Sequence, residues 1–317
     1  MQRWGNTARG TSRFRCRRCQ FTGVRQRPDH RKRHWQKRFV SWLTQSSSAA
    51  VLSERAGVSR STTQRGLRHH WDVVPLPRIG EGDIPVLVLD ATTVVKQTWV
   101  VLIAQDARRR RPVSWRFAAR ESYGAWASFL QSLAHAGIRP HCVVCDGQKG
   151  LLKAIRAVWP EALIQRCLLH VVRQARAWLT QHPKTPAGQA LLARVRTLFA
   201  VRTKRHRRRW LRAYRSWRRR YEGFLKQRSA HPTEPKRWWY THRKLRAVHS
   251  LIRNSLPDLF TYIRHPMIPR TSNHVEGGIN SRLKDLFRCH RGLSSDRKIV
   301  LTAWYLAVRQ GQKTNTK

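Results

Sequence analysis

Three short motifs that are far apart in the chain could bring three carboxylates into one site. The runs Pro85-Val-Leu-Val-Leu-Asp90 and Cys142-Val-Val-Cys-Asp146 are apolar, have the length of a strand, and each ends in an aspartate. In the third motif, Thr271-Ser-Asn-His-Val-Glu276, the glutamate lies just inside the start of a predicted helix. A buried strand presents a charged group at the edge of a sheet when its apolar run stops on a carboxylate.

Three carboxylates in one cluster would hold a pair of divalent cations. Magnesium (or manganese) prefers oxygen ligands, and two ions about 4 Å apart support phosphoryl transfer. One ion would activate the attacking water or 3′-hydroxyl, and the other would stabilise the leaving oxygen. Each residue also has a structural alternative: a single aspartate commonly caps a turn, and the helix dipole stabilises a glutamate in a first turn. Asp106 and Glu121, which also end predicted strands, are further candidates.

The net charge indicates the class of partner. The 317 residues include 65 Lys and Arg against 16 Asp and Glu, a formal charge of +49. Such an excess points to a polyanion and away from small metabolites or ordinary protein partners. Fourteen tryptophans indicate a folded chain, because disordered basic tails lack aromatic residues. A DNA-binding and an RNA-binding protein would share this charge.

The sequence favours a reducing compartment without membrane contact. No apolar run approaches the roughly 20 residues that span a bilayer, and the arginine-rich N-terminus lacks the apolar core of a secretory signal. Six unevenly spaced cysteines do not form a disulfide framework. We expect a cytoplasmic protein, located at the nucleoid.

The basic N-terminal region, residues 1–37, contains half of a zinc site. Cys16 and Cys19 have the Cys-x-x-Cys spacing by which one turn offers two thiolates to Zn²⁺. A complete site needs two more ligands, and His30 and His34 are candidates by their spacing. The simpler interpretation is an incomplete zinc ribbon.

Residues 38–74 resemble a helix-turn-helix. A first helix precedes Gly57, which makes the turn, and Ser59 caps a second helix. The second helix would read a major groove. An ordinary pair of packed helices is the alternative. The side chains that we expect on its DNA-facing side are Arg60, Gln64, Arg65 and Arg68.

A mixed α/β domain is predicted after a Pro- and Gly-rich linker. Three successive strands joined by short turns should be antiparallel, whereas later strands that alternate with helices should be parallel, with helices covering both faces. The predicted strands are 85–90, 97–105, 112–119, 140–146 and 162–166, and the predicted helices are 123–136, 149–158, one from 168, and 296–310.

Residues 171–265 are predicted to form an all-helical insertion, because nothing in this range resembles a strand. Trp210, Tyr214 and Trp217 recur near helical spacing and should pack a helical core. The arginines on the other side of that helix, among them Arg208 and Arg212, would then meet phosphate.

Residues 85–310 resemble the Mutator-type transposases of bacterial insertion sequences. The similarity lies in Asp146-Gly-Gln-Lys-Gly-Leu-Leu-Lys-Ala-Ile, in Gln165-Arg-Cys-Leu-Leu-His170, and in Ser272-Asn-His-Val-Glu-Gly-Gly-Ile-Asn-Ser-Arg-Leu-Lys284. These motifs occur in the family's order, and the combination is far more specific than any one of them.

The resemblance implies a ribonuclease-H-like catalytic domain made of residues 84–170 and 266–312, interrupted by the helical insertion. It makes Asp90, Asp146 and Glu276 the catalytic triad. Cys167 and His170 match the family's Cys-x-x-His pair, which could support DNA, support a metal-bound carboxylate, or be structural. Asn273 and Arg282 match positions that flank the glutamate, where contact with backbone phosphate is expected.

The N-terminal knuckle resembles a zinc-ribbon variant of the same family. That variant carries an earlier Cys-x-x-Cys, which this chain lacks, so either its start is internal to a longer protein or half of the ribbon has been lost. The missing Cys-x-x-Cys leaves open how the DNA ends would be recognised. It does not affect the prediction of the catalytic residues.

Together the motifs and the resemblance favour a magnesium-dependent transposase of the bacterial nucleoid. It would bind terminal inverted repeats and target DNA, hydrolyse a phosphodiester, and join the freed 3′-hydroxyl to a target strand, as a homo-oligomer on DNA. Two alternatives remain: a non-catalytic DNA-binding regulator, from a decayed or domesticated copy, and a basic RNA-binding protein.

Overall fold

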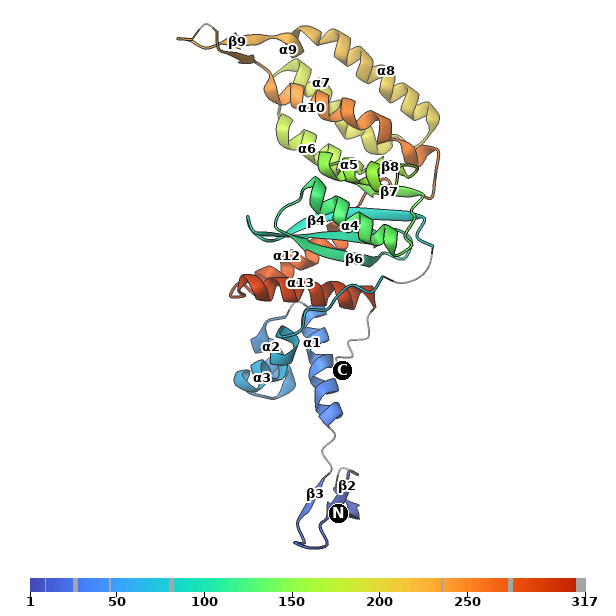
Figure 1. Ribbon diagram of the computed structural model, residues 1–317. Helices are drawn as coiled ribbons and strands as arrows, with labels where there is room; N and C mark the ends of the chain where they lie inside the picture. Colours follow the sequence, from blue (N-terminus) through green and yellow to red (C-terminus); the bar gives the residue numbers. More distant parts are fainter. Residues whose placement is uncertain are drawn as a thin grey trace. The chain divides into compact units, whose positions relative to one another are not determined.

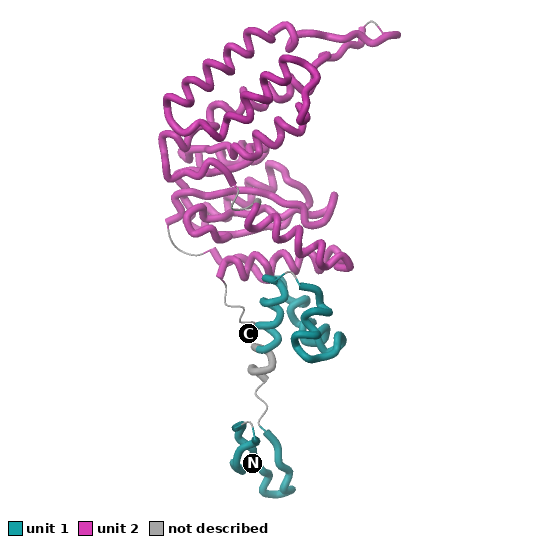
Figure 2. Tube along the Cα trace, turned by 180° about the vertical axis from the view of Figure 1, so that it is seen from behind, with its two compact units in different colours: residues 1–74, 314–317 teal, residues 75–313 magenta. Residues whose placement is uncertain are grey.

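The computed structural model describes residues 1–8, 10–24, 28–45, 47–79, 83–234, 236–272 and 276–311. The side chains of residues 28–33 and 276 lie outside this description. The chain divides into two compact units, residues 1–74 and residues 75–313 (Figure 2). No helix in the described ranges is long and apolar enough to span a membrane.

The first unit begins with a small antiparallel sheet in the order β1-β2-β3. Its strands are β1 (Gln2–Asn6), β2 (Ser12–Arg15) and β3 (Thr22–Val24). The Cys-x-x-Cys turn connects β2 to β3, and the Cys16 amide donates to the Phe21 carbonyl across it.

Three helices follow in this unit: α1 (Pro28–Gln45), α2 (Ala49–Ala56) and α3 (Arg60–Trp71). Gly57 closes α2 in the left-handed conformation, φ +60°, and the Ser59 side chain caps α3 by accepting from the Thr62 amide. Helices α1 and α3 approach closely at Gly66, where a Cβ atom would lie 2.2 Å from the Trp35 ring. Phe39 and Leu67 fill the core between the helices.

The second unit is built on a five-stranded mixed sheet in the order β6-β5-β4-β7-β8 (Figure 1). The first three strands pair antiparallel, and β7 and β8 add in parallel, which confirms the predicted mixed α/β architecture. The strands are β4 (Val86–Val95), β5 (Trp99–Asp106), β6 (Arg111–Ala118), β7 (Cys142–Cys145) and β8 (Leu163–Arg166).

Helices cover both faces of this sheet (Figure 1). Leu87 and Leu89 of β4 pack with Val143 of β7 against α4 (Tyr123–His135) and α5 (Lys149–Val158). The opposite face lies against α13 (Ser295–Gln310), which contacts β4 and β6. A short π-helical segment, η4 (Glu276–Asn280), leads into α12 (Ser281–Cys289) and from there to α13.

The chain between β8 and η4 forms a mainly helical layer. Its elements are α6 (Leu168–Leu179), α7 (Pro186–Arg196), η1 (Thr197–Ala200), α8 (Lys204–Arg220), α9 (Glu222–Lys226), β9 (Arg228–Ala230), β10 (Trp238–Tyr240), α10 (Arg243–Ser255), η2 (Leu256–Asp258) and η3 (Thr261–Ile263). As predicted, Trp210, Tyr214 and Trp217 turn inward and are buried.

The prediction that residues 171–265 are all-helical was wrong in one place. The strands β9 and β10 form an antiparallel hairpin in which Trp238 pairs with Ala230 and Tyr240 pairs with Arg228. Each strand has only three residues, so the hairpin leaves no long alternating pattern in the sequence. The run of three aromatic residues at 238–240 was the available signal, because aromatic side chains favour strands.

The returning chain is fastened to the sheet by Gln165 of β8. Its side-chain amide donates to the Leu259 carbonyl at 3.0 Å, and its side-chain oxygen accepts from the Tyr262 amide at 3.0 Å. Both bonds are buried, where hydrogen bonds must be satisfied. They bring the segment after the helical layer back to the sheet.

Candidate active site

Asp90 lies on β4, and Asp146 directly follows β7, the neighbouring parallel strand. Val86, Leu87 and Val88 of β4 pair with Cys142, Val143 and Val144 of β7, a constant register. If this register is continued for two more residues, to the position after β7, Asp90 falls opposite Asp146. Adjacent strands lie about 4.8 Å apart, so the register brings the two aspartates close together.

Asp90 leaves the sheet on the face opposite the core under α4 and α5. Side chains alternate along a strand, so Asp90 shares a face with Val88, whereas Leu87 and Leu89 belong to that core. Asp90 therefore points to the face where η4 lies, and Asn280 of η4 contacts it.

The expectation that Asp90 ends a strand was wrong. Strand β4 continues to Val95 because the following β-branched residues pair with β5 along their length, Thr92 with Val101 and Thr93 with Val100. The parallel partner β7 stops at Cys145. Asp90 therefore lies beside an opening in the sheet, where one neighbour has ended, and its side chain is only 6% exposed.

Asp146 is held by the tight turn that follows β7. Its Oδ1 accepts from the Gln148 amide at 2.9 Å, and its backbone carbonyl accepts from Arg166 Nε at 3.1 Å. Gly147 has φ +82°, and a Cβ atom there would lie 1.8 Å from Arg166 Nε. Only glycine fits this position, which accounts for the Asp-Gly pair in the motif.

The third motif contacts Asp90 directly. Asn280, the last residue of η4, donates from Nδ2 to Asp90 Oδ2 at 2.9 Å, and the bond is buried. The other carboxylate oxygen of Asp90 accepts from the Ala91 amide at 3.0 Å. Glu276 is the first residue of the same element, η4, so its backbone lies one turn from this contact. The position of the Glu276 side chain lies outside the described structure.

A second contact fixes the chain before Glu276. Cys167 Sγ accepts from the Ser272 amide at 3.3 Å and from the Ser272 hydroxyl at 3.2 Å, and both residues are buried. One residue further along the chain, at the start of α6, the Leu168 amide donates to the Arg270 carbonyl at 3.0 Å. Cys167 itself follows β8 and donates from its amide to the Cys145 carbonyl, one residue before Asp146.

These two contacts bracket the glutamate. The segment 272–280 is attached at its start to Cys167, beside the Asp146 strand, and at its end to Asp90. Asn273, predicted to flank the glutamate, falls within this segment but outside the described residues. The described residues on either side of this segment, Ser272 and Asn280, thus both contact the part of the sheet that carries the two aspartates.

The Cys-x-x-His pair has a defined electrostatic environment. Burial raises the pKa of the Cys167 thiol, but hydrogen bonding and charge from His170, together with the Ser272 bonds, outweigh it and lower the pKa. Cys167 thus holds Ser272 through two hydrogen bonds, and His170 acts on the Cys167 sulfur.

Glu121 lies near this site, and Asp106 does not. Burial raises the pKa of Glu121, and the charge of Asp146 acts in the same direction while that of His170 opposes it. Trp126 Nε1 donates to Glu121 Oε1 at 3.0 Å. Asp106 pairs with Leu87, at the other end of the sheet.

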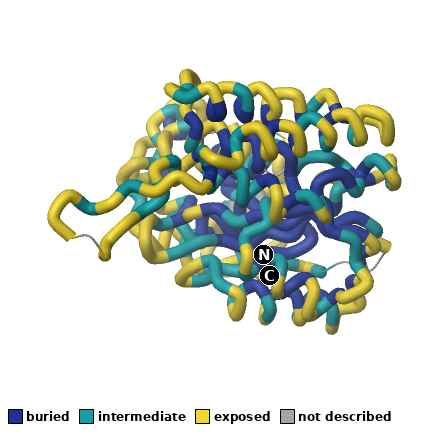
Figure 3. The backbone as a smooth tube through the Cα atoms, turned by 90° about the horizontal axis from the view of Figure 1, so that it is seen from above, coloured by how far each residue is buried: buried dark blue, intermediate teal, exposed yellow. Residues whose placement is uncertain are grey.

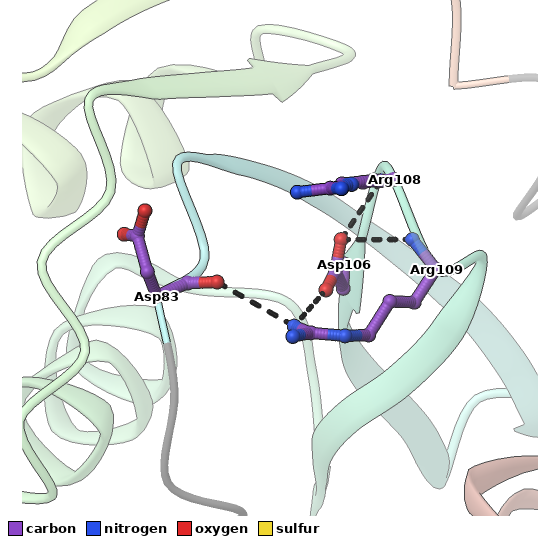
Figure 4. Close-up of polar contacts among 4 residues, drawn as sticks. All are labelled: Asp83, Asp106, Arg108 and Arg109. Carbon is purple, nitrogen blue, oxygen red and sulfur yellow. Dashed lines mark hydrogen bonds and ion pairs between the residues drawn. The ribbon is translucent and has the colours of Figure 1, made fainter.

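Asp106 has a structural role in the turn between β5 and β6 (Figure 4). Its Oδ1 accepts from the amides of Arg108 at 2.8 Å and Arg109 at 3.0 Å, and the Arg109 guanidinium reaches Oδ2 at 2.8 Å. Arg109 also donates to the Asp83 carbonyl. A carboxylate with these partners caps a turn.

The oxygen-rich chemistry of the site fits magnesium. Asp90 and Asp146 are carboxylates on β4 and directly after β7, and Asn280 Oδ1 is a buried oxygen without a hydrogen-bond partner among the described residues. Mg²⁺ takes such oxygens and fills its remaining positions with water. Among the described side chains, no three His, Cys, Asp or Glu groups gather closely enough to hold a metal, and the Glu276 side chain is not among them.

The N-terminal knuckle places the free cysteines Cys16 and Cys19 in the turn between β2 and β3. Backbone amides of Cys19 and Arg18 and the Cys19 thiol lower the pKa of Cys16. His34 is exposed on α1, whereas the His30 side chain lies outside the described structure. The two thiols fit half of a tetrahedral site.

The predicted DNA-contacting residues that the structure describes are exposed. On α3, Arg60, Gln64, Arg65 and Arg68 face away from the buried stripe of Thr63, Leu67 and His70. On α8, Arg208 and Arg212 are exposed opposite the buried aromatics and line shallow hollows together with Arg215. Arg282 is exposed on α12.

Sequence reasoning missed the roles of Asn280 and Ser272. Asn280 follows Glu276 by about one helical turn within the quoted motif, a spacing that places two side chains on the same face of a helix. That spacing was a usable signal. The partner of Ser272 is remote in the sequence, and no local pattern indicates it.

Comparison with known proteins matches the part of the chain that carries this site. The family model described as "Transposase, Mutator family" matches residues 81–285. A "probable transposase for insertion sequence element" of Corynebacterium diphtheriae is 37% identical over 75 residues, which cover 23% of this chain and 22% of that protein.

Two further relatives are similar. The transposase for insertion sequence element ISRM5 of Rhizobium meliloti (strain 1021) is 39% identical over 90 residues, covering 28% of this chain and 23% of that one. The transposase for insertion sequence element IS406 of Burkholderia multivorans is 28% identical over 175 residues, covering 51% and 43%. The matched segments thus span less than half the length of these relatives.

Proposed function

Because the chain belongs to the Mutator family of transposases, we propose that it is a DNA transposase of an insertion sequence, with Asp90, Asp146 and Glu276 as its catalytic carboxylates. The observation that supports this most strongly is the parallel register between β4 and β7, which, continued one residue past the end of β7, would set Asp90 opposite Asp146. The Asn280–Asp90 bond then attaches the element that carries Glu276 to the same place.

The proposed chemistry is phosphodiester hydrolysis followed by strand transfer in a ribonuclease-H-like domain. Two Mg²⁺ (or Mn²⁺) ions bound there would supply an activated nucleophile and stabilise the leaving oxygen. The residues of this chain that would hold them are Asp90, Asp146 and Glu276. Asn280 orients the Asp90 carboxylate, and the Gly147 turn orients Asp146.

The DNA-binding surfaces follow from the exposed basic helices. We assign terminal-repeat recognition to α3, whose Arg60, Gln64, Arg65 and Arg68 would reach base edges as the second helix of a helix-turn-helix. Arg208 and Arg212 of α8 and Arg282 of α12 would hold backbone phosphates. The Cys16–Cys19 knuckle would bind Zn²⁺ only if further ligands complete the site.

Two element ends must be handled together for strand transfer, so we expect the active form to be a homo-oligomer assembled on DNA. Target DNA would be the second nucleic-acid substrate.

The deciding experiment compares Asp90→Asn with Asp83→Asn, which makes the same chemical change on an exposed residue of the same unit. DNA carrying the ends of the element is incubated with each purified variant and Mg²⁺, and strand cleavage and DNA affinity are both measured. Asp90→Asn should bind DNA normally and lose cleavage, by more than the roughly 10–100-fold that an outer-shell change costs. Asp83→Asn should behave as the unmodified protein.

An alternative result would favour the second candidate. If the unmodified protein binds element ends but does not cleave them with Mg²⁺ or Mn²⁺, the chain is a DNA-binding regulator without catalysis. A preference for RNA with no effect of divalent metal would instead indicate an RNA-binding protein.

A further inference from the structure

The β9–β10 hairpin projects from the helical layer and has no role in the proposed chemistry (Figure 1). Its two strands pair only with each other among the described residues, so both outer edges are free of strand partners. The hairpin is firmly rooted: the Thr241 amide donates to the Gln227 carbonyl at 3.0 Å, and the Ser229 and Thr241 hydroxyls lie 2.8 Å apart. Two-stranded hairpins are marginally stable alone, and here Arg246 of α10 supports the hairpin by covering the Tyr240 ring and donating to the Leu225 carbonyl.

One face of the hairpin is a stack of aromatic rings and guanidinium groups. Trp238 and Tyr240 lie on the same face, since strand side chains alternate, and their rings meet edge to face at 5.3 Å. The Arg228 guanidinium lies 3.9 Å from the Trp238 ring centre and 5.8 Å from that of Tyr240. Arg246, from α10, covers Tyr240 at 3.3 Å.

This face is exposed to solvent. The projecting hairpin is largely exposed along its length (Figure 3), with Trp238 46% exposed and Arg228 exposed beside it. Burying the indole of Trp238 would stabilise the fold, and this free energy is not gained while the ring is exposed. The Arg228 guanidinium and the Tyr240 ring both contact the Trp238 ring, so less side-chain entropy would be lost when a flat partner stacks on it.

The charge of the hairpin identifies the partner as an anion. From Lys226 to Arg246 the sequence contains a single acidic residue, Glu234, against seven lysines and arginines. Glu234 is itself engaged by Arg237 at 3.4 Å. An exposed aromatic face set among arginines is the chemistry that holds nucleobases by stacking while cations contact the adjacent phosphates.

We propose that the β9–β10 hairpin is a binding site for unpaired nucleotides of DNA, with Trp238 as the stacking platform and Arg228 as the phosphate contact. A paired duplex keeps its base faces covered by neighbouring bases, so a stacking site selects nucleotides that are unpaired. The choice of DNA over RNA rests on the proposed function. In a transposase, such nucleotides arise where the duplex is distorted or cut.

The test uses two fluorescein-labelled DNA duplexes of identical length, one fully paired and one with an internal bubble of unpaired thymines. Affinity is measured by fluorescence anisotropy for the unmodified protein and for Trp238→Ala, Trp238→Phe and Met267→Ala. Met267 is an apolar side chain of the same unit, 83% exposed, so its variant controls for loss of exposed apolar surface. A 2-aminopurine placed in the bubble reports stacking directly, through quenching of its fluorescence.

The unmodified protein should bind the bubble duplex about tenfold more tightly than the paired one, and Trp238→Ala should abolish that preference. Trp238→Phe should keep most of it, and Met267→Ala all of it. Equal losses on both duplexes in Trp238→Ala, or no preference in the unmodified protein, would overturn the proposal. Cleavage of element ends is measured separately, so a protein that prefers the bubble but never cleaves would refute the proposed function and support the stacking site.

Discussion

Asn280 Nδ2 lies 2.9 Å from Asp90 Oδ2, in a buried contact between residues 190 positions apart. This bond joins the third sequence motif to the first. It orients the Asp90 carboxylate and simultaneously places η4, which begins at Glu276. Outer-shell partners of this kind fix the direction in which a carboxylate presents its oxygens to a metal.

Replacing Asn280 should therefore weaken metal-dependent cleavage. Asn280→Leu keeps a similar volume but removes the donor to Asp90, and we expect cleavage to fall by roughly 10–100-fold. The Mg²⁺ concentration for half-maximal cleavage should rise as well. The control is Asn254→Leu, an exposed position on α10. An unchanged Mg²⁺ dependence in Asn280→Leu would contradict a role for Asn280 in orienting the carboxylate.

Removing the Cys167 sulfur should slow cleavage without changing DNA affinity. Cys167→Ala deletes the acceptor of both Ser272 bonds and releases the start of the segment that carries Glu276. We expect kcat to fall and KM for DNA to stay constant, with partial recovery in Cys167→Ser. Cys142→Ala removes the same atoms from an equally buried cysteine, so it should lose similar stability with normal kcat. Equal kcat losses in both alanine variants would point to general destabilisation.

The arginines of α8 should set part of the salt dependence of DNA binding. If Arg208 and Arg212 each neutralise one phosphate, the double change to glutamine should reduce the slope of log K against log salt by about 0.9 for each phosphate that is no longer neutralised. The measurement is a salt titration of DNA affinity. Arg156→Gln is a suitable control, since Arg156 is paired with Asp258 at 3.4 Å. A slope that does not change in the double variant would remove α8 from the DNA interface.

Substitutions on α3 should change sequence preference more than overall affinity. Gln64→Ala and Arg65→Ala remove groups that would contact base edges, and each good pair of base contacts contributes about 1–3 kcal/mol of discrimination. Binding is compared between terminal-repeat DNA and unrelated DNA of the same length. We expect the ratio to fall while binding to unrelated DNA changes little. A uniform reduction on both DNAs would instead indicate phosphate contacts.

The packing of α1 and α3 should weaken in acid through His70. Burial lowers the pKa of His70 from 6.5 to about 4, with the charge of His69 acting in the same direction. In this pH range His70 binds a proton in the unfolded chain but not in the folded unit. The free energy of unfolding therefore decreases as pH falls from about 6.5 towards 4. Hydrogen-exchange protection factors in α1 and α3 should decrease over this range. His70→Phe should flatten the dependence, and His69→Gln should largely keep it; identical profiles in all three proteins would refute the prediction.

Local patterns determined most of the elements. Apart from the end of β4, the strands of the sheet and helices α4, α5 and α13 lie close to their predicted ranges, because each is encoded by its own apolar run or its own caps. The inward stripe of Trp210, Tyr214 and Trp217 is likewise a periodicity of one segment. The sequence also singled out the carboxylates and, through the family motifs, their order along the chain.

Only the tertiary structure decided how those pieces meet. Whether Asp90 lies opposite Asp146 depends on the register between β4 and β7. The apolar pattern of either strand is compatible with several registers. The continuation of β4 past Asp90 depends on pairing with β5. The contacts of Asn280 with Asp90 and of Ser272 with Cys167 join residues 190 and 105 positions apart. Such contacts follow from the packing of the whole unit, and no local sequence pattern contains them.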